Sequence, residues 1–361
     1  MDLQAGVLNE DFGGTGEGEL TQVNHGKLDY ERKAALYRET VLRIHSPIGH
    51  NAAMTPLLPL LENFYDPRVR DLVWVMAAPG LLSEAAVPNF YMPDAACRDA
   101  LAWAMPQLME LDNCPAPLLV WIAARNPQRL GPYFETLLAY WLTHLMDGQL
   151  IAANLPVKEG NLVLGEYDFL WRDAAGALHH WEAAVKFYLQ VDAAAGLAGY
   201  VGTLTRDRLD LKFAHLRDKQ LKLASTVAGK AALPSAGELV SARALLKGWL
   251  FYPHGQAITP APELSQQHSS GWWLRWDDTR FDPEQNLRWK VLPRLEWLTP
   301  AMSRTEDGLK TETVLRGFLT EHFAMDGGPI LIAGLAAVGD NWQELTRAFV
   351  VPPDWNPRNS T

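Results

Sequence analysis

Cysteine is scarce in this sequence, which holds only Cys97 and Cys114 among its 361 residues. Neither belongs to a CxxC or another metal-ligand spacing. A disulfide framework and a thiolate metal site are therefore excluded, and we expect two buried, reduced thiols in a cytoplasmic protein. Long apolar runs are missing as well. The longest ones, such as 329–338, are far shorter than the roughly 20 residues that cross a bilayer, so we expect no membrane partner.

Signatures of several enzyme classes are also absent. The sequence has no Gly-x-Ser-x-Gly elbow, no Walker loop and no HExxH helix, so acyl transfer, nucleotide hydrolysis and zinc proteolysis have no support. Residues 1–23 carry neither the basic region nor the apolar run of a secretory signal. The glycines at 13–18 follow no predicted strand and have acidic neighbours, which favours a flexible acidic tail over a dinucleotide-binding loop.

The composition that remains describes a globular chain. Hydrophobic residues make up 48%, enough for a substantial core, and the length suggests about two or three structural units. The sum of 32 Lys and Arg against 42 Asp and Glu gives a formal charge of −10. This charge argues against non-specific binding of nucleic acid or anionic lipid over the whole surface, although it leaves room for a local basic site.

The pattern along the chain divides it into four segments. We expect a flexible tail at 1–27, an all-α module at 28–125, an α/β core at 126–253 and a Trp-rich α+β extension at 254–361. In the module, charged and apolar residues alternate at three- and four-residue spacing between proline-rich connectors, which is typical of helices. Its helices are predicted at 29–45, 69–77, 95–111 and 118–125.

The core segment mixes helices and strands. Its predicted elements are a helix at 131–146, strands at 150–157, 161–171 and 177–191, a charged amphipathic helix at 206–223 and a strand at 242–252. Residues 172–176 suit the turn of a hairpin between the second and third strands. The extension is expected to hold strands at 271–276, 287–298 and 330–338 and a helix at 306–323.

Carboxylates and a lysine gather on the predicted hairpin. Residues two apart on a strand share a face, which places Glu166 with Asp168 on one strand and Glu182 with Lys186 on the next. Charges on such strands are costly unless they pair with each other or hold a metal. The alternatives are therefore a structural ion pair and a Mg²⁺ site, since Mg²⁺ binds through one or two carboxylates, water and phosphate oxygens.

Asp168, the hairpin and the run from Glu182 to Lys186 together resemble the catalytic hairpin of the PD-(D/E)xK, or restriction-endonuclease-like, nuclease superfamily. The predicted element order from Gly131 to Tyr252 is similar to the αβββαβ core of that superfamily. More closely, the segments LGPYFETL, GEYDFL, HWEAAVKFYL and DRLDLK resemble an uncharacterised bacterial domain-of-unknown-function family, DUF1853, placed in this superfamily. The resemblance implies an α/β fold with a restriction-endonuclease-like core.

The resemblance also implies roles for individual residues, with Mg²⁺ or Mn²⁺ as the cofactor. Asp168 takes the position of the metal-binding aspartate, and Lys186 takes that of the lysine that positions the attacking water. Ala184 replaces the acid that the motif places two residues before the lysine, so Glu182 would have to supply the second carboxylate. The implied metal ligands are Asp168, Glu182, Glu135 on the first core helix, and Glu166.

The helix after the hairpin is basic. Between Arg206 and Lys230, seven Lys or Arg stand against three Asp or Glu, a local charge of +4 within an acidic protein. Such a face can contact phosphates, which makes binding salt-dependent without sequence preference, but a solvated helix face has the same pattern. The candidates for substrate binding are Lys212, His215, Lys219 and Gln220, the last of which matches a glutamine often found on this helix in the superfamily.

Two functional hypotheses follow, and the sequence leaves the oligomeric state open. The first is a Mg²⁺-dependent nuclease that hydrolyses phosphodiester bonds in DNA or RNA, with Asp168, Glu182 and Lys186 as catalytic residues. The second is a catalytically inactive nuclease-like scaffold that binds nucleic acid or a protein partner. Ala184 and the acidic overall charge favour the second hypothesis.

The 14 tryptophans, an unusually large number, also allow two interpretations. Trp171 and Trp181 lie beside the proposed site, where exposed rings could stack on bases. Most of the others fall at or after Trp249, where packing inside a C-terminal sheet is the favoured interpretation. The segment 271–273 (Gly-Trp-Trp) is the first candidate in that region for a base-stacking or partner surface.

Overall fold

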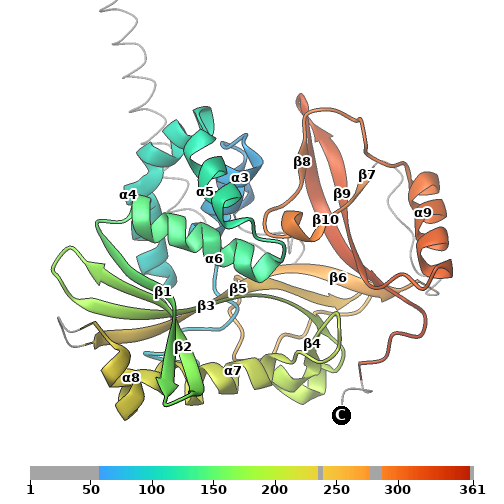
Figure 1. The fold of residues 1–361 in the computed structure, drawn as a ribbon. Coiled ribbons are helices and arrows are strands. Elements are labelled where there is room, and N and C mark those ends of the chain that lie inside the picture. Colours follow the sequence, from blue (N-terminus) through green and yellow to red (C-terminus); the bar gives the residue numbers. More distant parts are fainter. Residues whose placement is uncertain (1–56, 235–238, 277–286, 358–361) are drawn as a thin grey trace, which may run out of the picture.

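The computed structural model describes residues 57–234, 239–276 and 287–357. Within them the chain has a mixed α/β fold, in which helices come first and a ten-stranded sheet with interspersed helices follows (Figure 1). The predicted fold class is confirmed at this level. The predicted tail at 1–27 and the first part of the helical module, 28–56, lie outside the described residues.

The helices of the N-terminal module surround one apolar core. Their bounds are α2 (Leu58–Leu61), α3 (Pro67–Ala77), α4 (Asp94–Asn113) and α5 (Ala116–Arg125). Asp66 caps α3, because its side chain accepts hydrogen bonds from the backbone N–H groups of Arg68 and Val69. The last three helices begin and end within two residues of the predicted bounds, since capping residues and prolines mark their ends.

A buried lysine joins this module to the sheet. Lys247 lies on β5 (Leu239–Pro253), and its Nζ donates hydrogen bonds to the carbonyl oxygens of Val75 (2.7 Å) and Met76 (2.9 Å) at the end of α3. The last carbonyls of a helix lack partners within the helix and carry partial negative charge, so a cation is favourable there. The contact fixes the direction of α3 relative to the sheet.

The strands run through both the predicted core and the predicted extension as one sheet. The order is β1-β2-β3-β5-β6-β10-β9-β7, with β4 beside β3 and β8 beside β10. Among the first three strands, β2 is antiparallel to both of its neighbours, β1 and β3. By contrast, β5 lies parallel to β3 and β6. The bounds are β1 (Gly148–Glu159), β2 (Leu162–Asp173), β3 (Leu178–Gln190), β4 (Tyr200–Gly202), β5 (Leu239–Pro253), β6 (Ser269–Arg275), β7 (Arg288–Val291), β8 (Met302–Ser303), β9 (Ile330–Val338) and β10 (Asn341–Val351).

Helices cover both faces of the sheet around β3. On one face, α6 (Leu130–Tyr140), followed by one π turn (Trp141–Leu145), packs with the N-terminal helices against the apolar side chains of β3. On the other face, α7 (Leu209–Asp218) packs against β3 and β5. A 3₁₀ turn (Gln220–Ser225) and α8 (Val227–Ala232) then lead into β5, while α9 (Glu312–Ala324) packs against the C-terminal strands. The predicted order α6, β1, β2, β3, α7, β5 is present, but β4 precedes α7 and α8 follows it, and neither of these two elements was predicted.

The basic helix predicted at 206–223 is wrong as a continuous element. The chain leaves helical geometry at Lys219, where φ is −121° and ψ is −67°, and it continues as the 3₁₀ turn that starts at Gln220. The apolar side chains of both parts still face the sheet, since Leu216 and Leu223 are buried. The break therefore changes the direction of Gln220 without exposing the core.

Other predictions in the extension need correction. The strand predicted at 287–298 ends at Val291, because Pro293 interrupts it and a 3₁₀ turn follows. The stretch after β9 forms β10, a strand that was not predicted although it pairs with β6, β8 and β9. Cys97 is buried as expected, but Cys114 is exposed, since it ends α4 at the surface.

The tryptophans near the hairpin face the core. Trp171 and Trp181 are only 7% and 5% exposed, and the ring of Trp181 lies 5.7 Å from that of Trp141 after α6. Stacking of these rings on bases is therefore excluded. The indole N–H groups of Trp272 and Trp273, both half-buried, donate hydrogen bonds to Thr346 and to the Gln190 carbonyl, so these side chains contribute to packing between strands.

Among the described residues, no helix combines the length and the apolar character needed to cross a membrane.

The close approach of β5 to β3 depends on a glycine. Gly248 pairs with Lys186 and has a φ of +149°, and a Cβ atom added there would lie 1.7 Å from the Lys186 carbonyl oxygen. We expect Gly248→Ala to lower the free energy of unfolding by about 3 kcal/mol or more, because both the conformation and the contact are unfavourable for alanine. Urea denaturation measures the change.

Gly255→Ala is the matched control for this prediction. Gly255 also has a positive φ, +69°, but no atom lies within 4 Å of the added Cβ. Its substitution should cost only about 1–2 kcal/mol. Equal losses for the two variants would contradict the close contact between β3 and β5.

Candidate functional site

The site begins where β2 and β3 separate. The ladder between these strands covers four pairs, from Arg172–Leu178 to Phe169–Trp181, and beyond the last pair the two strands diverge. In Figure 1 the β1–β2 arm turns away from β3 toward α7 and α8. Asp168 and Glu182 are the next residues on the two strands, so they stand on opposite sides of the divergence. We call this place the strand fork.

The Asp168 side chain replaces a backbone hydrogen bond at the fork. Its Oδ2 accepts a hydrogen bond of 2.9 Å from the backbone N–H of Ala183 on β3. A buried N–H group needs a partner, and the neighbouring strand no longer supplies one at this point. Asp168, which is 8% exposed, thus has a structural reason to point across the fork toward Glu182.

Glu182 is fully buried within a chain of hydrogen bonds. Its Oε1 lies 2.6 Å from His180 Nε2, and its Oε2 accepts a hydrogen bond from Gln220 Nε2. The Oε1 of Gln220 in turn accepts a hydrogen bond of 3.2 Å from Lys212 Nζ. The break at Lys219 places Gln220 in this position, where it links a buried acid to a lysine on the covering helix.

Burial dominates the electrostatics of the two acids. Desolvation, reinforced by the charge of Glu182, raises the pKa of Asp168 to about 7. Desolvation also raises the pKa of Glu182 to about 7, while a hydrogen bond from the Asp168 side chain and the charge of Lys212 lower it. The two carboxyl groups therefore interact directly, and burial favours the protonated form of each of them.

Two further acids surround this pair. Glu135 on α6 is half-buried, and desolvation together with the charge of Asp168 raises its pKa to about 7 despite a hydrogen bond with Asn154. Glu166 on β2 is exposed, and its charge raises the pKa values of Glu135 and Glu182. Glu135 thus interacts electrostatically with Asp168, and Glu166 interacts with Glu135 and Glu182, whereas Asp168 and Glu182 contact each other directly.

Lys186 has a different partner from the one predicted. Its Nζ donates a hydrogen bond to Oδ2 of Asp207, and Tyr188 Oη donates to Oδ1 of the same carboxylate at 3.1 Å. Asp207 lies just before α7, so this contact ties β3 to the start of the covering helix. Of the two alternatives for the hairpin charges, Lys186 forms a structural ion pair, but with Asp207 rather than with an acid of the hairpin.

The predicted substrate-binding residues divide into two groups. Lys212 and Gln220 are half-buried and face the fork, whereas His215 and Lys219 are exposed. Other charges of the helix pair locally, for example Arg208 with Asp210 at 2.7 Å. The surface open to a ligand is therefore less basic than the local charge of the sequence indicates.

Sequence reasoning missed two residues of the site. His180 lies two residues before Glu182, so alternation along the strand places both side chains on one face, and this signal was available in the sequence. Burial lowers the pKa of His180 to about 4, so the ring is neutral at pH 7. Asp207 gave no local signal, since its contact with Lys186 depends on the path of the chain after β3.

Comparison with known protein families found one match, a domain of unknown function called DUF1853, over residues 70–351. This range covers most of the chain and includes every residue of the strand fork. The chain belongs to the DUF1853 family. Searches of curated proteins and of solved structures found no match.

The donors at the fork of this DUF1853 chain fit a Mg²⁺ ion that keeps most of its water. Mg²⁺ needs only one or two protein carboxylates, and Asp168 and Glu182 supply two at the fork. In the part of the chain that the structure describes, no group of three or more His, Cys, Asp or Glu side chains is placed to hold a metal ion. A cation at the fork would therefore depend on these two carboxylates, water and substrate oxygens.

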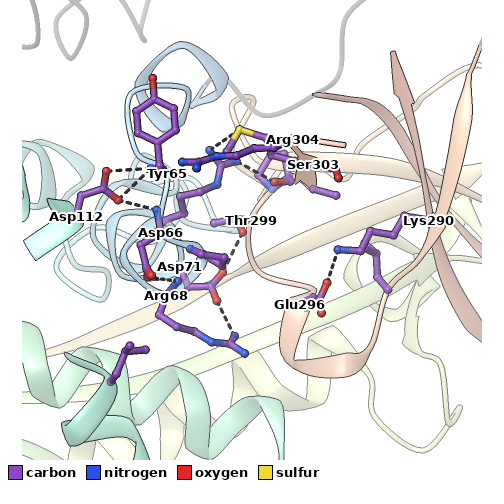
Figure 2. Close-up of a pocket in the computed structure, with 17 residues that line it drawn as sticks. Tyr65, Asp66, Arg68, Asp71, Asp112, Lys290, Glu296, Thr299, Ser303 and Arg304 are labelled. Atoms are coloured by element: carbon purple, nitrogen blue, oxygen red, sulfur yellow. Dashed lines mark hydrogen bonds and ion pairs between the residues drawn. The ribbon is translucent and has the colours of Figure 1, made fainter. Parts of the chain in front are cut away.

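A cavity of about 820 Å³ lies elsewhere, between α3 and the segment 299–304 (Figure 2). Asp71 is at its inner wall and accepts hydrogen bonds from Thr299 (2.9 Å), Tyr133 (2.7 Å) and Arg68 (3.3 Å). Lys290 pairs with Glu296 at 2.8 Å, also within the lining. Because these charges neutralise one another, we place the candidate site of the DUF1853 chain at the fork and interpret the cavity as a joint between the helical module and the extension.

The raised pKa of Asp168 predicts how stability depends on pH. An acid with a folded pKa of about 7 and an ordinary value of 3.8 binds more protons when folded, so its contribution to stability falls as pH rises from about 4 through about 7. Asp168→Asn removes this cost and retains an acceptor for Ala183. We expect the variant to gain about 1–3 kcal/mol of unfolding free energy relative to wild type between pH 5 and pH 8.

Asp173→Asn serves as the control of opposite sign. His179 and the backbone N–H of Ala177 hydrogen-bond to Asp173 and lower its pKa, so its loss should destabilise the protein above pH 4. Urea denaturation at pH 5 and at pH 8 measures the unfolding free energy of the two variants. If the difference in unfolding free energy between Asp168→Asn and wild type did not change with pH, the raised pKa of Asp168 would be contradicted.

Proposed function

We propose that this chain is a Mg²⁺-dependent phosphodiesterase that acts on DNA or RNA, built on a restriction-endonuclease-like core of the PD-(D/E)xK superfamily. The observation that carries the proposal is the contact of two buried carboxyl groups, Asp168 and Glu182, across a strand fork. Such a pair is unfavourable for stability and is therefore expected at functional sites. The order α6, β1, β2, β3, α7, β5 and the parallel pairing of β3 with β5 support the same core.

The proposed reaction is hydrolysis of a phosphodiester by water. The water oxygen forms a bond to phosphorus, the bond from phosphorus to one sugar oxygen breaks, and that oxygen takes one proton of the water. The second proton remains with the phosphate monoester. A bound Mg²⁺ would neutralise charge on the phosphate and lower the pKa of a bound water.

The residues of the chain would contribute position and charge. Asp168 and Glu182 would hold the cation, with Glu135 and Glu166 adding negative charge near the pair. Deprotonation of the acid pair near neutral pH would prepare it for a cation. A lysine ammonium group beside the pair would orient the attacking water and stabilise negative charge at phosphorus, and the superfamily resemblance assigns this role to Lys186.

The proposal is tested by metal-dependent cleavage. The purified chain should cleave single- or double-stranded DNA or RNA when Mg²⁺ or Mn²⁺ is present and lose the activity with EDTA. Asp168→Asn should reduce the cleavage rate by about 100-fold or more, because it removes a carboxylate ligand while keeping the fold. Gel-resolved cleavage rates measure the effect.

Asp173→Asn is the matched control, since Asp173 lies on the same strand at the end remote from the fork. Its rate should equal that of wild type. Equal rates for wild type and Asp168→Asn, or cleavage that is insensitive to EDTA, would overturn the proposed assignment.

A second candidate is a nuclease-like scaffold that binds nucleic acid or a protein without cleaving it. Ala184 in place of the motif acid and the complete burial of Glu182 favour this function, because both limit access of a cation to carboxylates. It predicts binding without cleavage. For a nucleic acid ligand, Lys219→Met should weaken binding to all sequences equally and reduce the slope of log affinity against log salt by about 1.

Fluorescence anisotropy at several salt concentrations measures that slope. The scaffold function also predicts that Mg²⁺ does not raise the unfolding temperature. A rise that Asp168→Asn abolishes would contradict it, because a ligand that binds only the folded state stabilises that state.

A further inference from the structure

The lysines Lys186 and Lys212 have different hydrogen-bond partners. Lys186 comes from β3, and its ammonium group is bound by Asp207. Lys212 comes from α7, and its ammonium group is bound by Gln220, which also donates to Glu182. One lysine is thus linked to the acid pair by an intervening amide, and the other is linked to a separate carboxylate.

The spacing along β3 explains why Lys186 is remote from the acids. Glu182 and Lys186 are four residues apart, about 13 Å along a strand, whereas the motif spacing of two residues gives about 7 Å. Ala184 occupies the position from which a carboxylate would meet the lysine. Compared with the motif, the acid lies two residues nearer the fork, whereas Lys186 keeps the position of the motif lysine.

The charges at the fork also connect the acids with Lys212 and not with Lys186. Lys212 lowers the pKa of each of the acids Asp168, Glu182 and Glu135. Burial and the charge of Lys186 lower the pKa of Lys212 itself. Lys186 is therefore a neighbour of Lys212, whereas its own ammonium group is bound by Asp207.

We propose that Lys212, rather than Lys186, is the lysine that serves the Asp168–Glu182 pair, and that Gln220 positions it. This inference rests on the proposed function for its catalytic part. Lys212 donates hydrogen bonds to the attacking water and to a non-bridging phosphate oxygen, and it neither gains nor loses a proton. Lys186 is a positioning residue, because with Tyr188 it binds Asp207 and thereby fixes the start of α7, from which Lys212 extends.

Steady-state cleavage separates the two lysines. Lys212→Met should reduce kcat by about 100-fold or more with little change in KM, since one donor to the reacting atoms is removed. Lys212→Arg should recover part of kcat. Lys186→Met should reduce kcat by less than about tenfold, and Lys219→Met, on the exposed part of the same helix, should raise KM instead.

A loss of kcat in Lys186→Met that exceeds the loss in Lys212→Met would overturn the inference and leave the proposed function intact. Absence of metal-dependent cleavage by wild type would overturn the proposed function instead. In that case the inference is still decided by the energetic coupling between each lysine and Glu182, because this coupling is measured by unfolding and needs no activity.

The coupling is measured with double-mutant cycles in urea. The change in midpoint caused by Lys212→Met should be clearly smaller in a Glu182→Gln background than in wild type, whereas the change caused by Lys186→Met should be the same in both. Coupling of Lys186 but not Lys212 to Glu182 would overturn the inference. Glu182→Gln keeps the side-chain volume, so the comparison does not depend on a cavity.

Discussion

The separation of β2 from β3 after the pair Phe169–Trp181 is the constraint on which the candidate site depends. At this point one strand loses its neighbour, and the backbone N–H of Ala183 needs another acceptor. Asp168 supplies it, which turns a carboxylate inward at the place where Glu182 faces it from the other strand. A regular hairpin would have used this N–H in its ladder and left no reason for an acid to be buried here.

Burial of the pair then determines what surrounds it. Two carboxyl groups removed from water are unfavourable unless protons, hydrogen bonds or cations compensate, and the fork uses all of these. Gln220 and His180 contact Glu182, and Lys212 extends the chain of hydrogen bonds to the covering helix. Burial raises the pKa values of both acids to about 7, while the charge of Lys212 opposes the rise. The family match includes the whole arrangement, because it spans 70–351.

The sequence predicted the local part of this structure and missed the part that depends on distant contacts. Alternation along the strands placed Asp168 and Glu182 on one hairpin, and the structure brings them together. Lys186 obeys the same alternation, but its partner Asp207 comes from a loop after the strand, and no periodicity encodes that choice. The break at Lys219 was also invisible, because the apolar spacing continues through it and only the backbone direction changes. Trp181 was expected near the ligand, since alternation tells which residues share a face but not which face the core covers.

We propose that the acid pair at the fork exchanges protons for a divalent cation. Crystals of the full chain, grown with Mn²⁺ and measured near the manganese absorption edge, provide the test. We expect an anomalous peak within direct coordination distance of the Asp168 and Glu182 carboxylates, and no such peak in crystals of Asp168→Asn. A fork without a peak at saturating Mn²⁺, with both carboxylates still in mutual contact, would contradict it.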